Sequence, residues 1–274
     1  MSDFHIPGSG FARHHVTVDR YNILYAVAGE GPTLVSVPGS AGAEMSTAKD
    51  LLARRFKVIE LNPPGFGPND DLLGTIDHKE LASLLGRALE AMGEHSYHVL
   101  GTSIGGFAAM WLALERHKET LSLTLEAPMN FLDASAARSP EMFHTFAALG
   151  TGSVRLADVL PMIDKSPAPS IHPRKPWADV DFFREQMRNR LRLFQHLVNL
   201  HDEELKERVR TLKCPIMWIL SEQDEVIHPH AKDQFLQYAP LARTELWPEG
   251  THDLQNTQPE RFAESVTRFI GELG

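Results

Sequence analysis

The segment 101–105 reads Gly-Thr-Ser-Ile-Gly and has the form G-x-S-x-G, a pattern that can present a nucleophilic serine. An apolar run at 97–101 leads into Ser103, and a helix-length segment at 104–117 follows it. A tight strand-to-helix turn strains the serine backbone and lifts its hydroxyl above the sheet edge, while the flanking glycines avoid collisions there. The N-terminus of the following helix favours negative charge beside the hydroxyl. We therefore predict that Ser103 is a catalytic nucleophile; an ordinary glycine-rich turn is the alternative.

A serine hydroxyl is a weak nucleophile at neutral pH and needs a neighbouring base. Of the 14 histidines, His252 stands out because it follows the last predicted strand and precedes the last predicted helix. Asp224 also follows a predicted strand, between the competing carboxylates Glu222 and Glu225, and could orient the imidazole and stabilise its charged form. The chain order Ser103, Asp224, His252 is the one expected on a doubly wound sheet. We predict a catalytic triad; solvated loop residues are the alternative for His252 and Asp224.

The elements that must position these side chains can be predicted from the apolar pattern. Residues 13–28 suggest a two-stranded hairpin, after which short apolar runs alternate with helix-length segments. The runs lack an in-and-out alternation, which is typical of parallel strands covered on both faces. Strands are expected at 33–37, 56–61, 97–101, 121–125, 216–220 and 244–247, and helices at 44–54, 77–92, 104–117, after Pro229 and at 259–270. The predicted fold class is α/β, with a mostly parallel, doubly wound sheet.

The alternation of strands and helices stops between residues 130 and 207. This segment carries several prolines and no convincing strand, but apolar residues recur at helical spacing between 183 and 198. We interpret 130–207 as a helical cap inserted into a core that is formed by 1–129 and 208–274.

Three cap residues, Phe183, Met187 and Trp177, are candidates for an apolar ceiling over the substrate, although they could equally pack the cap on the core. The arginines at 184, 188, 190 and 192 could bind a substrate carboxylate or form a solvated helix face. Substrate choice is therefore expected to depend on this segment.

Taken together, these segments resemble the α/β-hydrolase superfamily with a cap domain, over nearly the whole chain. The resemblance is carried by Gly-Thr-Ser-Ile-Gly-Gly at 101–106, the Asp224 loop that ends at Pro229, His252 with the following Gln-Pro-Glu at 258–260, and the glycine-rich turn at 61–67.

The resemblance implies an oxyanion hole made of two backbone N–H groups. One would belong to Ile104, after the nucleophile, and the other to Ser40 in the loop at 37–41, where Gly39 would also contact the substrate. The chain departs from the family in having Pro38 before Gly39, where His is common, and Asn62, where Asp is common. Backbone donors do not require that histidine.

Composition excludes several classes of protein. The chain has 274 residues, of which 42% are hydrophobic, so it is neither a disordered tail nor a fibre. Its formal charge of −9 argues against nucleic acid as a partner. The single cysteine excludes an intramolecular disulfide and favours a reducing compartment. Without an apolar run of roughly 18 residues or a signal peptide, we expect a soluble, cytoplasmic protein with no membrane partner.

No cofactor is expected. The histidines of the cap lack metal-ligand spacing with cysteine or carboxylate partners, and no G-x-G-x-x-G follows the first parallel strand. The leading functional hypothesis is a serine hydrolase for a small, fairly apolar ester, lactone or related acyl compound. The expected partner is thus a small-molecule substrate, and a homodimer is possible. A carbon–carbon bond hydrolase for a diketone would use the same triad. A ligand-binding, receptor-like member of the fold is the alternative from another class.

Overall fold

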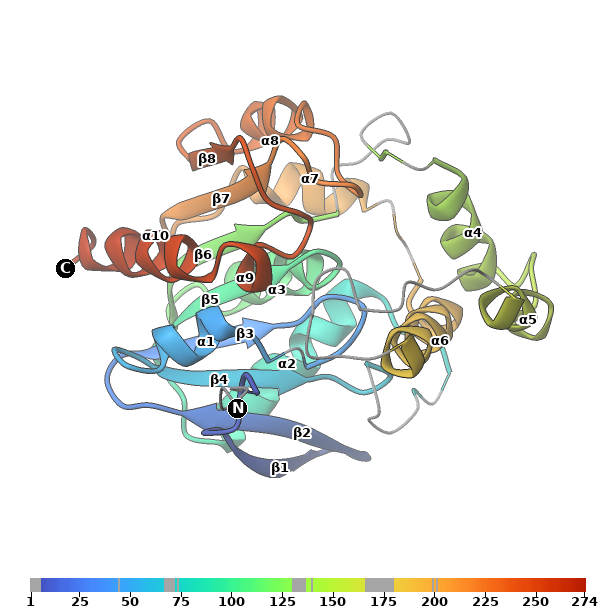
Figure 1. The fold of residues 1–274 in the computed structure, drawn as a ribbon. Helices are drawn as coiled ribbons and strands as arrows, with labels where there is room; N and C mark the ends of the chain where they lie inside the picture. The colour runs from blue at the N-terminus through green and yellow to red at the C-terminus, as the bar shows by residue number, and fades with distance from the viewer. Residues whose placement is uncertain are drawn as a thin grey trace, which may run out of the picture.

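The apolar runs form one eight-stranded sheet in the computed structural model, which describes residues 6–43, 45–66, 72, 74–129, 137–138, 140–165, 180–198, 200 and 202–274 (Figure 1). The strands are β1 (Ala12–Val18), β2 (Tyr21–Ala28), β3 (Thr33–Val37), β4 (Lys57–Asn62), β5 (Tyr97–Thr102), β6 (Thr120–Glu126), β7 (Ile216–Ser221) and β8 (Arg243–Trp247). The helices are α1 (Thr47–Leu52), α2 (His78–Ala91), α3 (Gly105–Glu115), α4 (Pro140–Gly150), α5 (Leu156–Lys165), α6 (Val180–His196), α7 (Glu203–Val209), α8 (Ala231–Tyr238), α9 (Leu254–Thr257) and α10 (Pro259–Gly271).

The strand order of the sheet is β1-β2-β4-β3-β5-β6-β7-β8. The pairs β1–β2 and β2–β4 are antiparallel, and all other neighbouring pairs are parallel. The predicted fold class is therefore confirmed. Because parallel strands end at a common edge, the residues that follow β3, β5, β6, β7 and β8 meet at one edge of the sheet.

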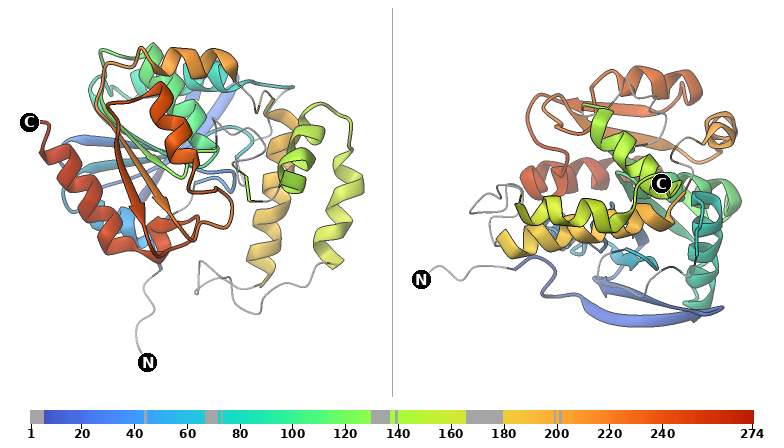
Figure 2. Two further views of the ribbon diagram at one scale, coloured as in Figure 1. Left: turned by 90° about the horizontal axis from the view of Figure 1, so that it is seen from above. Right: turned by 90° about the vertical axis from the view of Figure 1, so that its right-hand side faces the viewer.

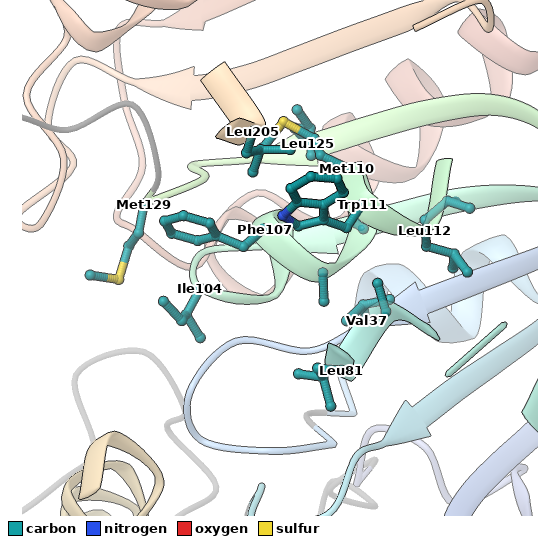
Figure 3. Close-up of a cluster of buried hydrophobic side chains, with 14 of the residues drawn as sticks. Val37, Leu81, Ile104, Phe107, Met110, Trp111, Leu112, Leu125, Met129 and Leu205 are labelled. Atoms are coloured by element: carbon teal, nitrogen blue, oxygen red, sulfur yellow. The ribbon is translucent and has the colours of Figure 1, made fainter. Parts of the chain in front are cut away.

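The strands β3 to β7 bury both of their faces, which explains why their apolar runs do not alternate, whereas β1 at the edge of the sheet is mostly exposed. Val35 of β3 belongs to the cluster that contains residues of α2 and α3, whereas its neighbour Leu34 belongs to the cluster that contains residues of α1 and α10. Ile59 and Val58 of β4 divide in the same way. Figure 2 shows the helices on the two sides of the sheet, and Figure 3 shows the packing of Phe107 and other α3 side chains in the larger cluster.

Local signals set several helix boundaries. Helix α2 begins after Asp77, whose side chain accepts from the N–H of Glu80 at 2.8 Å while Glu80 accepts from the N–H of Asp77 at 3.1 Å. This capping box fits the predicted helix at 77–92. Helix α1 starts later than the predicted residue 44, because the hydroxyl of Ser46 accepts from the N–H of Lys49 and caps the helix there.

Between β6 and α7 the described residues form the helices α4, α5 and α6, which stand to one side of the sheet in Figure 1. The sequence pattern predicts only the last of them and misses α4 and α5. Pro161 lies inside α5. An interior proline normally destabilises a helix by about 3 kcal/mol, so the local sequence does not predict a helix at this position. The helices are held by packing instead: Phe146 of α4 stacks on Phe194 of α6 with ring centroids 4.0 Å apart.

The C-terminal limit predicted for the cap, residue 207, lies within α7. This helix packs on α3, and just before it Asp202 accepts a hydrogen bond from the indole of Trp111 at 2.8 Å. The division into core and cap stays a prediction. In the described part of the chain, none of the helices combines the length and the apolar character needed to cross a membrane.

Candidate active site

Ser103 lies in the turn between β5 and α3 and has a φ of 50°, a left-handed conformation that is costly for a residue with a side chain. The turn is also very tightly packed. A Cβ on Gly101 would lie 2.4 Å from the Cβ of Ala109, and one on Gly105 would lie 2.2 Å from the carbonyl oxygen of Pro38. Only glycine fits at these two positions, so the G-x-S-x-G pattern has the steric cause that the sequence predicts.

The three residues of the predicted triad are in contact. The Nε2 atom of His252 lies 2.9 Å from the Oγ of Ser103, and its Nδ1 atom lies 2.9 Å and 3.1 Å from the two carboxylate oxygens of Asp224. Ser103 and His252 are 6% and 8% exposed and Asp224 is fully buried. The order of contacts is nucleophile, base and acid, which is the arrangement that general-base activation of a serine requires.

Asp224 is held as a carboxylate. Burial alone would raise its pKa, but the charge and hydrogen bond of His252 and the N–H groups of Ile227 and Val226 together lower the pKa below its usual value. These two N–H groups donate to Oδ1 at 2.8 Å and 2.7 Å. Because an ionised carboxylate only accepts hydrogen bonds, Nδ1 of His252 must carry the proton, which leaves Nε2 to accept from Ser103.

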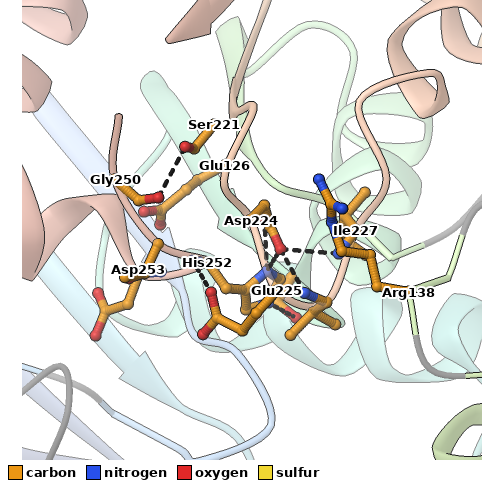
Figure 4. Close-up of polar contacts among 12 residues, drawn as sticks. Glu126, Arg138, Ser221, Asp224, Glu225, Ile227, Gly250, His252 and Asp253 are labelled. Atoms are coloured by element: carbon orange, nitrogen blue, oxygen red, sulfur yellow. Dashed lines mark hydrogen bonds and ion pairs between the residues drawn. The ribbon is translucent and has the colours of Figure 1, made fainter. Parts of the chain in front are cut away.

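Glu225, one of the two competing carboxylates, binds the backbone of the histidine loop. Its Oε2 atom accepts from the N–H of His252 at 3.0 Å, and Ser221 at the end of β7 donates from its hydroxyl to the carbonyl of Gly250 at 2.8 Å. Figure 4 shows that Glu225 and Asp224 approach His252 from one loop. The loop after β7 therefore fixes both the backbone and the ring of His252.

A second buried carboxyl group, that of Glu126 at the end of β6, connects the residue before the nucleophile with the segment that follows His252. It accepts from the hydroxyl of Thr102 at 3.0 Å, from the side-chain amide of Gln255 at 2.5 Å and from the N–H of Gln255 at 3.1 Å. Its carbonyl accepts from the N–H of Ser103 at 2.9 Å. Burial, and then the negative charge of Asp253, raise the pKa of Glu126 to about 7. Glu126 is not among the site residues predicted from the sequence, although a glutamate that ends an apolar run at the strand edge is a usable signal.

The loop after β3 lies against the nucleophile. A Cβ on Gly39 would be 3.5 Å from the Cβ of Ser103, and Gly39 and Ser40 both line the cavity above the serine. In the described part of the chain, neither the N–H of Ser40 nor that of Ile104 donates a hydrogen bond to another residue. Ser40 lines the cavity whereas Ile104 is not among its lining residues, and an oxyanion hole made of these two N–H groups stays a prediction.

A cavity of about 590 Å³, counted out to its open mouth, lies between the triad and the helices α4 and α6. The part of this space that is open to the centre of a water-sized sphere is about 60 Å³, so most of the larger figure belongs to the mouth. The cavity is lined by Gly39, Ser40, Ala41, Thr102, Ser103, Met129, Phe146, Met187, Arg190, Val226, His252 and Asp253.

Of the predicted ceiling residues, Met187 lines this cavity, Phe183 is not among the lining residues, and Trp177 lies outside the described residues. Most of the remaining apolar wall is supplied by residues that were not predicted from the sequence, namely Met129, Phe146 and Val226. Met129 follows β6 at the same strand edge as the triad, and this position could have indicated it.

Among curated proteins, the chain is similar to the dihydrolipoyllysine-residue acetyltransferase component of the acetoin cleaving system of Cupriavidus necator, with 30% identity over 120 residues and 43% of this chain. It is also similar to the polyketide synthase ThaQ of Burkholderia thailandensis, with 27% identity over 89% of this chain. The chain spans only 32% and 12% of the length of these two relatives. A third relative, the pimeloyl-acyl-carrier-protein methyl ester esterase of Aeromonas hydrophila, is 24% identical and matches 93% of this chain and 99% of its own length.

Solved structures share the fold. One is the meta-cleavage product hydrolase CumD of Pseudomonas fluorescens, with a TM-score of 0.70, 16% identity, and coverage of 94% of this chain and 98% of the other. A profile of the alpha/beta hydrolase family matches residues 34–265, which is most of the sequence. The chain therefore belongs to the alpha/beta hydrolase family.

Proposed function

We propose that this α/β hydrolase is a serine hydrolase with Ser103 as nucleophile, His252 as general base and acid, and Asp224 as the carboxylate that orients the imidazole. The observation that carries the proposal is the continuous line of hydrogen bonds from Asp224 through His252 to Ser103, with Ser103 and His252 on the wall of a cavity. A fold alone would not support an activity, but a contact set of this kind does.

In the proposed reaction, Nε2 of His252 takes the hydroxyl proton as Oγ of Ser103 forms a bond to the substrate carbonyl carbon. Asp224 stabilises the imidazolium, and the N–H groups of Ser40 and Ile104 receive the oxyanion. Collapse of this intermediate breaks the bond to the leaving group, which takes the proton from His252. Water then loses a proton to His252 and attacks the acyl carbon, and the bond from this carbon to Oγ of Ser103 breaks as Oγ takes the proton from His252, which releases the acid and restores Ser103.

The substrate class we propose is a small, fairly apolar ester, lactone or related acyl compound. Met129, Phe146, Met187 and Val226 give the cavity an apolar wall, which suits an acyl chain. The Aeromonas relative, which matches over almost its whole length, is a methyl ester esterase. We also propose that residues 130–207 act as a cap, because Phe146 and Met187 reach the cavity from α4 and α6.

A fluorophosphonate probe tests the nucleophile directly. The wild-type protein should be labelled at Ser103, and labelling should be lost in Ser103→Ala and His252→Ala. Ser96→Ala, which changes an exposed serine, is the matched control and should label like the wild type. Absence of labelling in the wild type would overturn the proposal and favour a ligand-binding role.

A substrate panel then separates ester from carbon–carbon chemistry. The wild type should hydrolyse p-nitrophenyl esters or lactones faster than diketones, with activity lost in Ser103→Ala. The fold shared with the meta-cleavage product hydrolase CumD makes a carbon–carbon hydrolase the second candidate. Faster cleavage of the diketones would establish that candidate instead.

A further inference from the structure

The cavity above Ser103 is apolar on the side of the inserted helices, with one exception, Arg190 of α6. Among the described lining residues, Arg190 is the one with a permanent positive charge. The other three arginines of this helix, at 184, 188 and 192, do not line the cavity, and Arg192 is exposed. The structure thus distinguishes one arginine from a group that the sequence pattern leaves equivalent.

The rotation of α6 that brings Arg190 to the cavity is set by packing. Leu193 and Phe194, three and four residues after Arg190, lie on the same face of the helix and are fully buried, and Phe194 stacks on Phe146, which also lines the cavity. Arg190 follows Met187 by three residues, so the two side chains share a face. The Nη1 atom of Arg190 lies 3.8 Å from the sulfur of Met187, and both residues line the cavity.

We propose that Arg190 forms an anion-binding subsite and that the substrate is an ester which carries a carboxylate a few bonds away from its scissile carbonyl. The inference deepens the proposed function and rests on it. A guanidinium presents a planar fork of donors that matches a carboxylate in two parallel hydrogen bonds. Its half-buried position beside apolar side chains strengthens the attraction, because less water screens the charges there.

The charges of the cavity also orient such a substrate. Asp253 lines the cavity next to His252, and Asp224 lies behind the imidazole, so the catalytic end repels an anion. Arg190 attracts it on the side of α6. The carbonyl carbon is therefore directed to Ser103 and the carboxylate to α6. The formal charge of −9 on the whole chain repels anions at long range, so a local cation is needed for this selection.

Two matched pairs of esters test the subsite. In the first pair, mono-p-nitrophenyl adipate carries a carboxylate where p-nitrophenyl hexanoate has a methyl group. In the second pair the carboxylate is on the leaving group, in 4-carboxyphenyl hexanoate and phenyl hexanoate. The measured quantity is the ratio of kcat/KM for the anionic ester to that for its neutral partner. In Arg190→Met this ratio should fall by about 10-fold to 100-fold for at least one pair, as expected for a lost charge-assisted hydrogen bond.

Arg192→Met is the matched control, since it removes an exposed arginine of the same helix that does not line the cavity, and both kcat/KM values should match the wild type. Arg190→Lys keeps the positive charge but loses the planar fork of donors, so its ratio of kcat/KM values should lie between those of the wild type and Arg190→Met. If Arg190 is merely structural, both esters of a pair will slow equally and the ratio will not change. That result would overturn the inference.

A binding measurement separates failure of the subsite from failure of the proposed function. In Ser103→Ala protein, monomethyl adipate should bind more tightly than methyl hexanoate by calorimetry, and adding Arg190→Met should remove the difference. Loss of this preference on adding Arg190→Met supports the subsite even if no ester is hydrolysed. Equal affinities with and without Arg190 overturn it even if esters are hydrolysed well.

Discussion

His78 gives the sharpest test of the packing around α3. It is the first residue of α2, is 1% exposed, and stacks on Phe107 with ring centroids 4.1 Å apart and an interplanar angle of 12°. Neither of its ring nitrogens has a hydrogen-bond partner in the described part of the chain. Burial lowers the pKa of His78 to about 3. The folded protein therefore holds His78 neutral at every pH at which it is expected to work.

The lowered pKa of His78 determines in which direction the free energy of unfolding changes with pH. The unfolded chain protonates this histidine near the ordinary pKa of 6.5, whereas the folded chain does so only near 3. Between these values the unfolded state binds more protons, so the free energy of unfolding falls as the pH falls. At about 1.36 kcal/mol per pH unit, lowering the pH from about 7.5 to about 5 removes about 2 kcal/mol through this one side chain.

The variant that tests this reasoning is His78→Phe, which keeps an aromatic ring on Phe107 and removes the titration. Urea unfolding followed by tryptophan fluorescence should show that His78→Phe loses about 2 kcal/mol less than the wild type over the same pH interval. His95→Gln, at an exposed histidine, is the control and should keep the wild-type difference. An equal loss in His78→Phe and the wild type would refute the assignment of a buried neutral imidazole.

Three further predictions follow from the site. Asp224→Asn should lower kcat by about 10⁴-fold, because the amide stabilises neither the imidazolium nor the Nδ1–H tautomer, and steady-state kinetics on an ester that the wild type hydrolyses will measure the loss. Gly105→Ala should lower Tm by several degrees in a thermal melt and reduce activity, since its Cβ would meet the carbonyl of Pro38 at 2.2 Å; unchanged values would contradict the packing of the turn. Glu126 has a raised pKa, of about 7, so it makes the wild type lose about 2.5 kcal/mol of stability as the pH rises from about 5 to about 8. Urea unfolding at these two pH values should show a smaller loss of stability for Glu126→Gln than for the wild type. An identical loss in the two proteins would show that Glu126 is already ionised at the lower pH.

The parts of this molecule that could be predicted from sequence are those with a local cause. The capping box of Asp77 and Glu80 marks the start of α2, and the triad could be found because each member follows a strand at the same sheet edge. Ser103 also carries its steric signature in the flanking glycines. In these cases a few adjacent residues contain the whole physical reason.

Features that depend on distant partners could not be predicted in the same way. Helix α5 contains Pro161 and depends on packing against α6. Which arginine of α6 reaches the cavity depends on the rotation of that helix, set by contacts such as Phe194 on Phe146. Glu126 meets Gln255, which is 129 residues away in the chain. Sequence pattern contains the residue types in each case, but only the tertiary fold brings the partners together.

At Ser103, activity requires a side chain, whereas the left-handed backbone conformation is less costly without one. Selection for activity and selection for stability therefore favour different residues at this position. Glycine would adopt the same φ without the penalty, which is about 1–2 kcal/mol for a residue with a side chain. In a lineage that no longer needed the nucleophile, a change to glycine here would be favoured by stability alone. Loss of function at this serine would therefore also relieve backbone strain, and an engineered Ser103→Gly protein would be inactive while losing only the contact between Oγ and the imidazole of His252.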